Sequence, residues 1–205
     1  MADIILILDE SGSMDSQSRT MINSVNELIS EQKKLLAKTE LTPERINMHI
    51  YRFSSTVKNA ISAPLMSFPT FTAKDYAPDG MTALYDAIGT VLQRFHDSKN
   101  KTVLVIATDG EENSSKEYTL DTIKAKLKAK KEAGWSVIYL SETLKTKEQG
   151  REMGLSGNSN VSVGSSALCS VMKNKHFHRA IQHACMDGGE DDFELEMEAC
   201  GQDYE

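Results

Sequence analysis

Oxygen-bearing side chains follow a run of apolar residues near the start of the sequence. The run is Ile4–Leu8, and Asp9, Ser11 and Ser13 occupy alternate positions of the turn after it. A carboxylate and two hydroxyls at this spacing can converge on one point, while Gly12 relieves the backbone between them. Such an all-oxygen set suits a hard divalent cation such as Mg²⁺. The alternative is a plain turn followed by a helix cap, because Asp and Ser are common in both roles.

Two later segments carry oxygen-bearing residues in a similar setting. Thr82 lies in Gly80–Ile88 and opens a pattern of apolar residues at helical spacing. Asp109 lies just beyond a second continuous apolar run, Thr102–Ala107. In an open parallel sheet, ligands collect beyond the carboxyl ends of the strands, so we expect Asp9 and Asp109 to be neighbours there. Taken alone, Thr82 is equally well explained as a helix N-cap, and a cap hydroxyl can also contact a metal.

Together the three segments resemble the von Willebrand factor type A family. The metal-ion-dependent adhesion site of that family is written Asp-x-Ser-x-Ser, then Thr, then Asp, and its counterparts here are Asp9, Ser11, Ser13, Thr82 and Asp109. The resemblance implies that these residues bind a divalent ion, Mg²⁺, with Mn²⁺ or Ca²⁺ as alternatives. The two serine hydroxyls would bind it directly, and the other three groups directly or through water. The remaining position would accept an Asp or Glu carboxylate from a partner protein.

The later part of the chain extends the resemblance. Gly134-Trp135, Leu140 and Gly154-Leu155 resemble the corresponding part of stand-alone bacterial and phage type A proteins. This similarity implies that the chain is a member of that stand-alone group.

Hydrophobic patterns predict alternating strands and helices. Continuous apolar runs are typical of strands buried on both faces, and three-and-four spacing is typical of amphipathic helices. The predicted strands are Ile4–Leu8, Ile46–Phe53, Val57–Ile61, Thr102–Ala107, Ser136–Leu140 and Val161–Val163. The predicted helices are Ser16–Lys38, Thr82–Asp97, Leu120–Ala133, Thr146–Met153 and Ser165–Met186. We therefore expect a doubly wound, Rossmann-like α/β fold with a mainly parallel central sheet, helices on both faces and one short antiparallel edge strand.

Two regions are expected to lie outside this regular pattern. The stretch Ala63–Gly80 holds three of the four prolines and no helical period, which predicts a long surface loop with Phe68 and Phe71 tucked beneath it. Residues 187–205 are acidic and interrupted by Gly, which is typical of a disordered solvating tail. We therefore expect one domain over residues 1–186, followed by this tail.

The composition excludes several classes of protein. A formal charge of −7 argues against a nucleic-acid partner, which would require clustered positive charge. The start of the chain lacks the features of a signal peptide, and no stretch approaches the roughly 20 apolar residues of a membrane span. Cys169, Cys185 and Cys200 lie far apart with no Cys-x-x-Cys pair, which argues against a zinc site or a disulfide framework. We expect a cytoplasmic protein that binds neither nucleic acid nor membrane.

The leading functional hypothesis is a metal-dependent protein-binding module that is not an enzyme. One alternative is a Mg²⁺-dependent hydrolase, for example a phosphatase with Asp9 as nucleophile. Aspartyl phosphatases of similar fold generally place a second acidic residue two positions after the nucleophile, where this sequence has Ser11. No phosphate-binding loop or Gly-x-Ser-x-Gly elbow occurs either. The other alternative is an assembly protein that uses the fold without metal-dependent binding, and the full ligand set argues against it.

Overall fold

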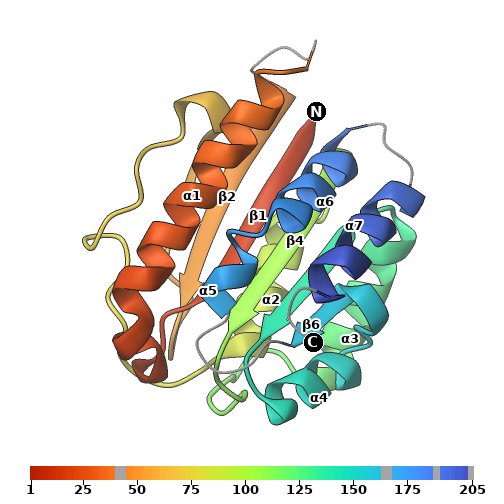
Figure 1. Cartoon of the computed structure of the whole chain (residues 1–205). Coiled ribbons are helices and arrows are strands. Elements are labelled where there is room, and N and C mark those ends of the chain that lie inside the picture. Colours follow the sequence, from red (N-terminus) through yellow and green to blue (C-terminus); the bar gives the residue numbers. More distant parts are fainter. Residues whose placement is uncertain (40–44, 163–167, 187–189, 203–205) are drawn as a thin grey trace.

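The central feature of the molecule is a six-stranded sheet in the order β3-β2-β1-β4-β5-β6 (Figure 1). The structure, a computed structural model, describes residues 1–39, 45–162, 168–186 and 190–202. The strands are β1 (Ala2–Asp9), β2 (Ile46–Phe53), β3 (Ile61–Pro64), β4 (Lys101–Thr108), β5 (Ser136–Ser141) and β6 (Asn160–Ser162). Neighbouring strands are parallel except for β2 and β3, which are antiparallel. The expected mainly parallel sheet with one antiparallel edge strand is therefore confirmed.

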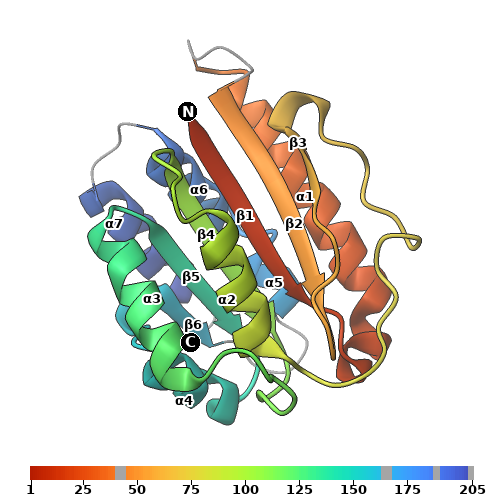
Figure 2. The ribbon, with the colours of Figure 1, turned by 180° about the vertical axis from the view of Figure 1, so that it is seen from behind.

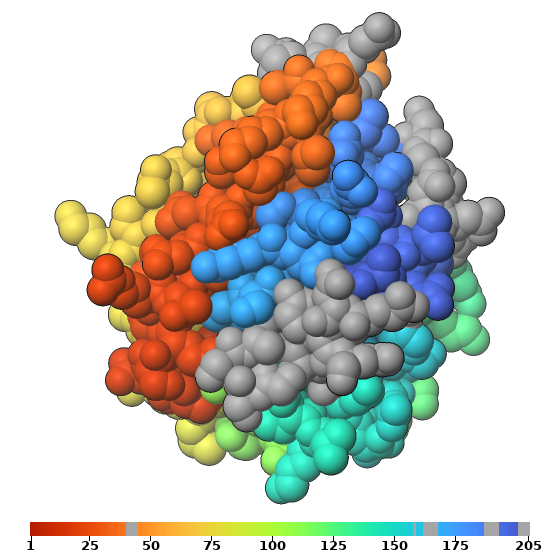
Figure 3. Space-filling model, viewed as in Figure 1, coloured from red at the N-terminus to blue at the C-terminus, as the bar shows by residue number. Residues whose placement is uncertain are grey.

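Helices cover both faces of the sheet. The α-helices are α1 (Ser18–Leu36), α2 (Leu84–Arg94), α3 (Leu120–Glu132), α4 (Leu144–Glu152), α5 (Leu168–Val171), α6 (Lys175–Cys185) and α7 (Glu190–Gln202). Short 3₁₀ helices are η1 (Gly12–Gln17), η3 (Leu65–Ser67) and η4 (Gly157–Ser159). Helices α1, α5, α6 and α7 lie on one face (Figures 1 and 3), and α2 and α3 lie on the other (Figure 2).

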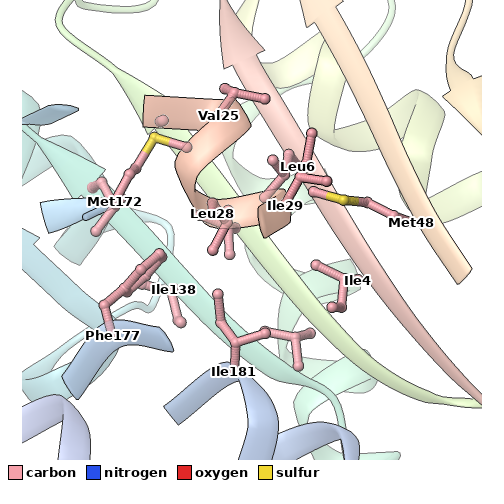
Figure 4. Packing of buried hydrophobic residues seen from close by; sticks show 14 of the residues in the cluster. Ile4, Leu6, Val25, Leu28, Ile29, Met48, Ile138, Met172, Phe177 and Ile181 are labelled. Carbon is pink, nitrogen blue, oxygen red and sulfur yellow. The ribbon is translucent and has the colours of Figure 1, made fainter. Parts of the chain in front are cut away.

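The central strand β1 is apolar at successive positions because it contributes to two cores. Ile4 and Leu6 belong to the cluster beneath α1 and α6, whereas Ile5 and Ile7 belong to the cluster beneath α2 and α3. Successive side chains of a strand point to opposite faces, so a strand covered on both sides needs apolar residues throughout. Figure 4 shows the first of these cores, where Leu6 lies beside Ile29 of α1 and Ile4 lies between Met48 of β2 and Ile181 of α6.

The connections that leave β1 and β4 run on opposite faces of the sheet. The chain passes from β1 to β2 through α1 on one face, and from β4 to β5 through α3 on the other. A crevice between two such strands, at their carboxyl ends, is where open α/β sheets bind ligands. Leu8 pairs with Ala107, so Asp9 and Asp109 emerge at this same point. The expected proximity of the two strand ends is confirmed.

Some boundaries differ from the sequence-based expectations. The edge strand was expected at Val57–Ile61, but β3 begins at Ile61 and Val57 makes only an isolated bridge with Phe53. Thr82 was expected to open a helix, yet α2 begins at Leu84. Both shifts reflect side-chain hydrogen bonds and strand pairings that hydrophobic spacing does not encode. Helix α1 also starts later than expected, because the residues after the first turn form η1.

The last predicted helix is two helices in the structure. Residues 165–167 of the predicted span lie outside the described residues, and α5 ends at Val171. Asn174 then caps α6, with its side chain accepting a hydrogen bond from His176 N–H at 2.7 Å. An Asn side chain at this position satisfies a free N–H of the new helix. The continuous apolar spacing across the break concealed the cap.

Within the acidic segment expected to be disordered, residues 190–202 form helix α7, and residues 187–189 and 203–205 lie outside the described residues. Its Phe193, Met197 and Cys200 form a stripe at helical spacing and are buried in the core beside α6. Glu196 lies 2.6 Å from His176 Nδ1 and 3.7 Å from Arg179. The many acidic residues of this segment concealed an amphipathic pattern in which three apolar residues form the buried stripe.

The two aromatic residues of the long loop are buried as expected. Phe68 and Phe71 are both almost inaccessible, and Phe71 lies against Tyr76 with ring centroids 6.1 Å apart. Cys169, Cys185 and Cys200 are all buried, and none of the three takes part in a disulfide. Within the described part of the chain, no helix has the length and apolar character needed to cross a membrane.

Candidate functional site

Four of the five predicted site residues are joined by hydrogen bonds at the carboxyl ends of β1 and β4. Asp9 Oδ1 accepts from the N–H of Ser11 at 2.8 Å, which folds the turn back on the strand. Ser11 Oγ lies 3.1 Å from Ser13 Oγ, and Ser13 Oγ donates to Asp109 Oδ1 at 2.7 Å. These hydrogen bonds connect two loops that are far apart in the sequence, since Ser13 and Asp109 are separated by 96 positions.

Thr82 joins this group from a third loop. A Cβ placed on Gly110 would lie 2.9 Å from Thr82 Oγ1 and 3.6 Å from Asp9 Oδ2, so both oxygens border the space that the glycine leaves free. Gly80, two residues earlier, accepts a backbone hydrogen bond from Gly12 at 3.1 Å. The structure therefore brings the hydroxyl of Thr82 to the same strand ends, although no hydrogen bond joins it to the other four.

Two residues that sequence analysis did not single out hold the site in place. Thr108 is fully buried, and its hydroxyl donates to Asp9 Oδ2 at 2.5 Å. Asn113 Oδ1 accepts from the N–H of Thr82 at 2.9 Å, and Asn113 N–H donates to the Thr82 carbonyl at 3.0 Å. In the sequence, Thr108 and Asn113 are marked only by their closeness to Asp109. That closeness does not show whether a residue supports the site or merely belongs to the loop.

The two site aspartates lie in an environment that disfavours their ionised forms. Asp9 is inaccessible to solvent, and burial raises its pKa to about 6, assisted by the nearby charge of Asp109. Burial also raises the pKa of Asp109, while the hydrogen bond from Ser13 opposes that rise. Two carboxylates in a partly dry site repel each other, and a cation is the natural way to stabilise both.

Two acidic residues that lie close to the site in sequence are turned away from it. Glu10 is buried, with one oxygen accepting from the N–H of Ala77 and the other paired with Lys58. Glu112 accepts from the N–H groups of Tyr85, Ser114 and Ser115. Both carboxylates hold the surrounding loops, and Lys58 offsets the charge of Glu10.

The donor set fits a small hard cation. Adjacent ligands of an octahedral ion bound at about 2.1 Å lie about 3 Å apart, and the oxygens of Ser11, Ser13 and Asp109 are spaced at 3.1 and 2.7 Å. Among the described residues, no three His, Cys, Asp or Glu side chains gather in a way that could hold a metal. The candidate site depends instead on hydroxyls beside two carboxylates, which is an all-oxygen set typical of Mg²⁺ rather than of softer metals.

The fold and the site together define a class of protein: a doubly wound α/β domain with polar loops gathered at its topological switch point. Residues 3–168 match the family described as the von Willebrand factor type A domain. The chain belongs to this family. A comparison with curated protein sequences gives no match.

Solved structures show the same fold at low sequence identity. The vWF domain of a type V pili tip protein from Porphyromonas gingivalis is similar with a TM-score of 0.69 and 10% identity, covering 94% of this chain and 98% of that one. Proximal thread matrix protein 1 from the mussel byssus has a TM-score of 0.60 and 21% identity, covering 84% of this chain. A further structure of that mussel protein has a zinc-occupied MIDAS motif, with a TM-score of 0.58 and 21% identity over 84% of this chain. This chain spans 46% of the mussel protein in both structures.

Proposed function

We propose that this protein is a Mg²⁺-dependent protein-binding module. One observation carries the proposal: hydroxyl and carboxylate oxygens from loops far apart in sequence are spaced about as octahedral ligands are, at the switch point of the sheet. Ser11 and Ser13 would bind the ion directly, and Asp9, Thr82 and Asp109 directly or through water. When bound, the ion supplies the positive charge that the buried Asp9 and the half-buried Asp109 lack.

The partner would bind through an Asp or Glu side chain. Asp9, Ser11 and Thr82 are buried, whereas Ser13 is exposed and Asp109 half-buried, so an ion held here has its accessible side toward solvent. Mg²⁺ retains open or water-filled positions in such sites, and a partner carboxylate can replace a water. The ion pair between Glu10 and Lys58 favours this, because it reduces the repulsion that an incoming anion would meet.

The arrangement of Asp9 argues against a hydrolase. A nucleophilic carboxylate must reach its substrate, but Asp9 is fully buried. Each of its two oxygens also accepts a hydrogen bond, one from Ser11 N–H and one from Thr108 Oγ1. These contacts suit a residue that positions a metal and the loops around it, which supports a binding role without catalysis.

Isothermal titration with Mg²⁺ tests the metal site. Asp109→Ala is expected to weaken binding at least about 10-fold, because it removes one of two charged ligands. Asp97→Ala removes the same charge from a fully exposed side chain and is the matched control. A pull-down in Mg²⁺ and in chelator then tests partner binding. Equal Mg²⁺ affinity in the two variants would overturn the proposed site, and identical bound proteins in both pull-downs would overturn metal-dependent binding.

A further inference from the structure

Large apolar side chains are exposed on both sides of the candidate metal site. Met81 is 52% exposed and Leu144 is 83% exposed, although a protein usually buries side chains of this kind. Met81 directly precedes Thr82, and its N–H donates to Ser55 Oγ at 2.9 Å, just beyond the end of β2. Met81 therefore marks one flank of the site, on the β2 side.

Leu144 marks the opposite flank, at the start of α4 and just beyond β5. Gln17 Nε2 donates to Glu142 Oε2 at 3.1 Å, which ties this segment to the end of η1, the short helix that contains Ser13. Lys145 Nζ lies 3.1 Å from Glu111 Oε1, which ties it to the loop after β4. Both ties fix the segment beside the loops of the metal site.

The strand order gives the spacing of the two flanks. Along the sheet the order is β2, β1, β4, β5, with Asp9 after β1 and Asp109 after β4. Neighbouring strands lie about 4.8 Å apart, so positions beyond β2 and β5 are about 14 Å apart, with the metal site between them. An extended peptide rises about 3.3 Å per residue, and residues two positions apart point to the same side. Residues four positions apart in such a peptide are therefore about 13 Å apart, which matches this distance.

We propose that the partner presents an extended segment in which the acidic residue has apolar residues two positions before it and two positions after it. The acidic side chain binds the metal, and the two apolar side chains pack on Met81 and Leu144. This inference rests on the metal-dependent binding proposed above and adds the pattern that the partner must carry. Many proteins expose acidic residues, and a metal ion alone would not distinguish one from another. Hydrophobic contacts with Met81 and Leu144 would give the site specificity for an acidic residue that has apolar residues on both sides.

Synthetic peptides with blocked ends test the pattern directly. Gly-Leu-Ser-Asp-Ser-Leu-Gly has leucines at the required positions, and Gly-Ser-Leu-Asp-Leu-Ser-Gly has them one residue too close. A third peptide with serine at all flanking positions and a fourth with Asn in place of Asp complete the set. Affinity is measured in Mg²⁺ and in chelator by fluorescence anisotropy. The first peptide is expected to bind about 10-fold more tightly than the second and third.

Protein variants separate the flanks from the metal. Met81→Ser and Leu144→Ser are each expected to weaken binding of the first peptide about 3-fold to 10-fold and to leave the all-serine peptide unchanged. Met66→Ser is the control, because Met66 is 41% exposed but follows β3 at the opposite end of the sheet. Mg²⁺-dependent binding of all three Asp peptides with equal affinity would overturn this inference and leave the proposed function intact. Failure of every Asp peptide to bind in Mg²⁺ would overturn both.

Discussion

The two ends of β1 each bury an aspartate, and the two carboxyl groups are held in different ways. Asp3 accepts hydrogen bonds from Asn100 at 2.9 Å and Asn47 at 3.2 Å, and it lies 3.5 Å from His49 Nε2. Burial alone would raise the pKa of Asp3, but these hydrogen bonds outweigh it and lower the pKa. Asp9 has fewer such partners, and burial raises its pKa to about 6.

The difference between these two aspartates indicates their roles. The carboxylate of Asp3 is stabilised by its neighbours, so its ionised form strengthens the fold. Asp9 lacks a positive partner among its contacts and faces a second carboxylate, so its ionised form weakens the fold, and the cation that we propose would offset this cost. Both side chains are almost inaccessible to solvent, but Asp9 lies deeper among protein atoms and has fewer hydrogen-bond donors, and together these two differences raise its pKa while the pKa of Asp3 is lowered.

The largest expected effect is on metal binding by Asp9→Asn. This isosteric change removes one charge from the site and should weaken Mg²⁺ binding at least about 100-fold in isothermal titration. Asp3→Asn at the other end of the strand should leave the affinity unchanged. Similar losses in both variants would mean that the two carboxylates do not differ in role.

Thr108→Val tests whether a supporting hydroxyl tunes the site. The variant keeps the shape of the side chain but removes the hydrogen bond to Asp9 Oδ2, so Mg²⁺ affinity should fall about 10-fold to 100-fold. Thr102→Val is the control, because Thr102 is buried in the same strand and bonds only the Asn100 carbonyl. Urea unfolding checks that both variants remain folded, and an unchanged affinity in Thr108→Val would contradict a positioning role.

Stability without metal should change in opposite directions at the two ends. Asp3 has a lowered pKa, so its contribution is present above its unfolded pKa and is lost as the pH falls through the folded pKa. Asp3→Asn should therefore lower the free energy of unfolding by about 2 kcal/mol at pH 7.

Asp9 has a raised pKa, so the unmetallated protein loses stability as the pH rises from about 4 to about 6. Asp9→Asn should restore about 1 to 3 kcal/mol of that loss at pH 7 in chelator. Urea unfolding measures both, and two changes of the same sign would break the comparison.

The smallest expected effect is the pH dependence of metal binding. With the pKa of Asp9 near 6, protons compete with the metal below that pH, so Mg²⁺ affinity should rise as the pH rises through about 6. The affinity at pH 5 should be about 10-fold weaker than at pH 7. Titrations in matched ionic strength measure this, with Asp9→Asn as the variant in which the dependence should become weaker, because only Asp109, whose pKa is also raised, then competes for protons. A flat profile in the wild-type protein would show that Asp9 does not exchange a proton for the metal.

The sequence alone determined the fold class and the central strands, because buried parallel strands require continuous apolar runs such as Ile4–Leu8. The same local chemistry identified Asp9, Ser11 and Ser13, which are close in the chain and need no long-range information. Asp109 was predictable because it follows a strand of the same kind. Metal binding by this set is still a prediction that the experiments above must test.

The tertiary structure decided the features that depend on contacts between distant segments. The inward orientation of Glu10, the support from Thr108 and the different neighbours of Asp3 and Asp9 all come from residues on other strands and loops. The packing of α7 is a further example, because its three buried apolar residues become a core face only through contact with α6. Hydrophobic periodicity predicts which face of a helix or strand is buried. It does not predict which side chains of other elements will contact that face.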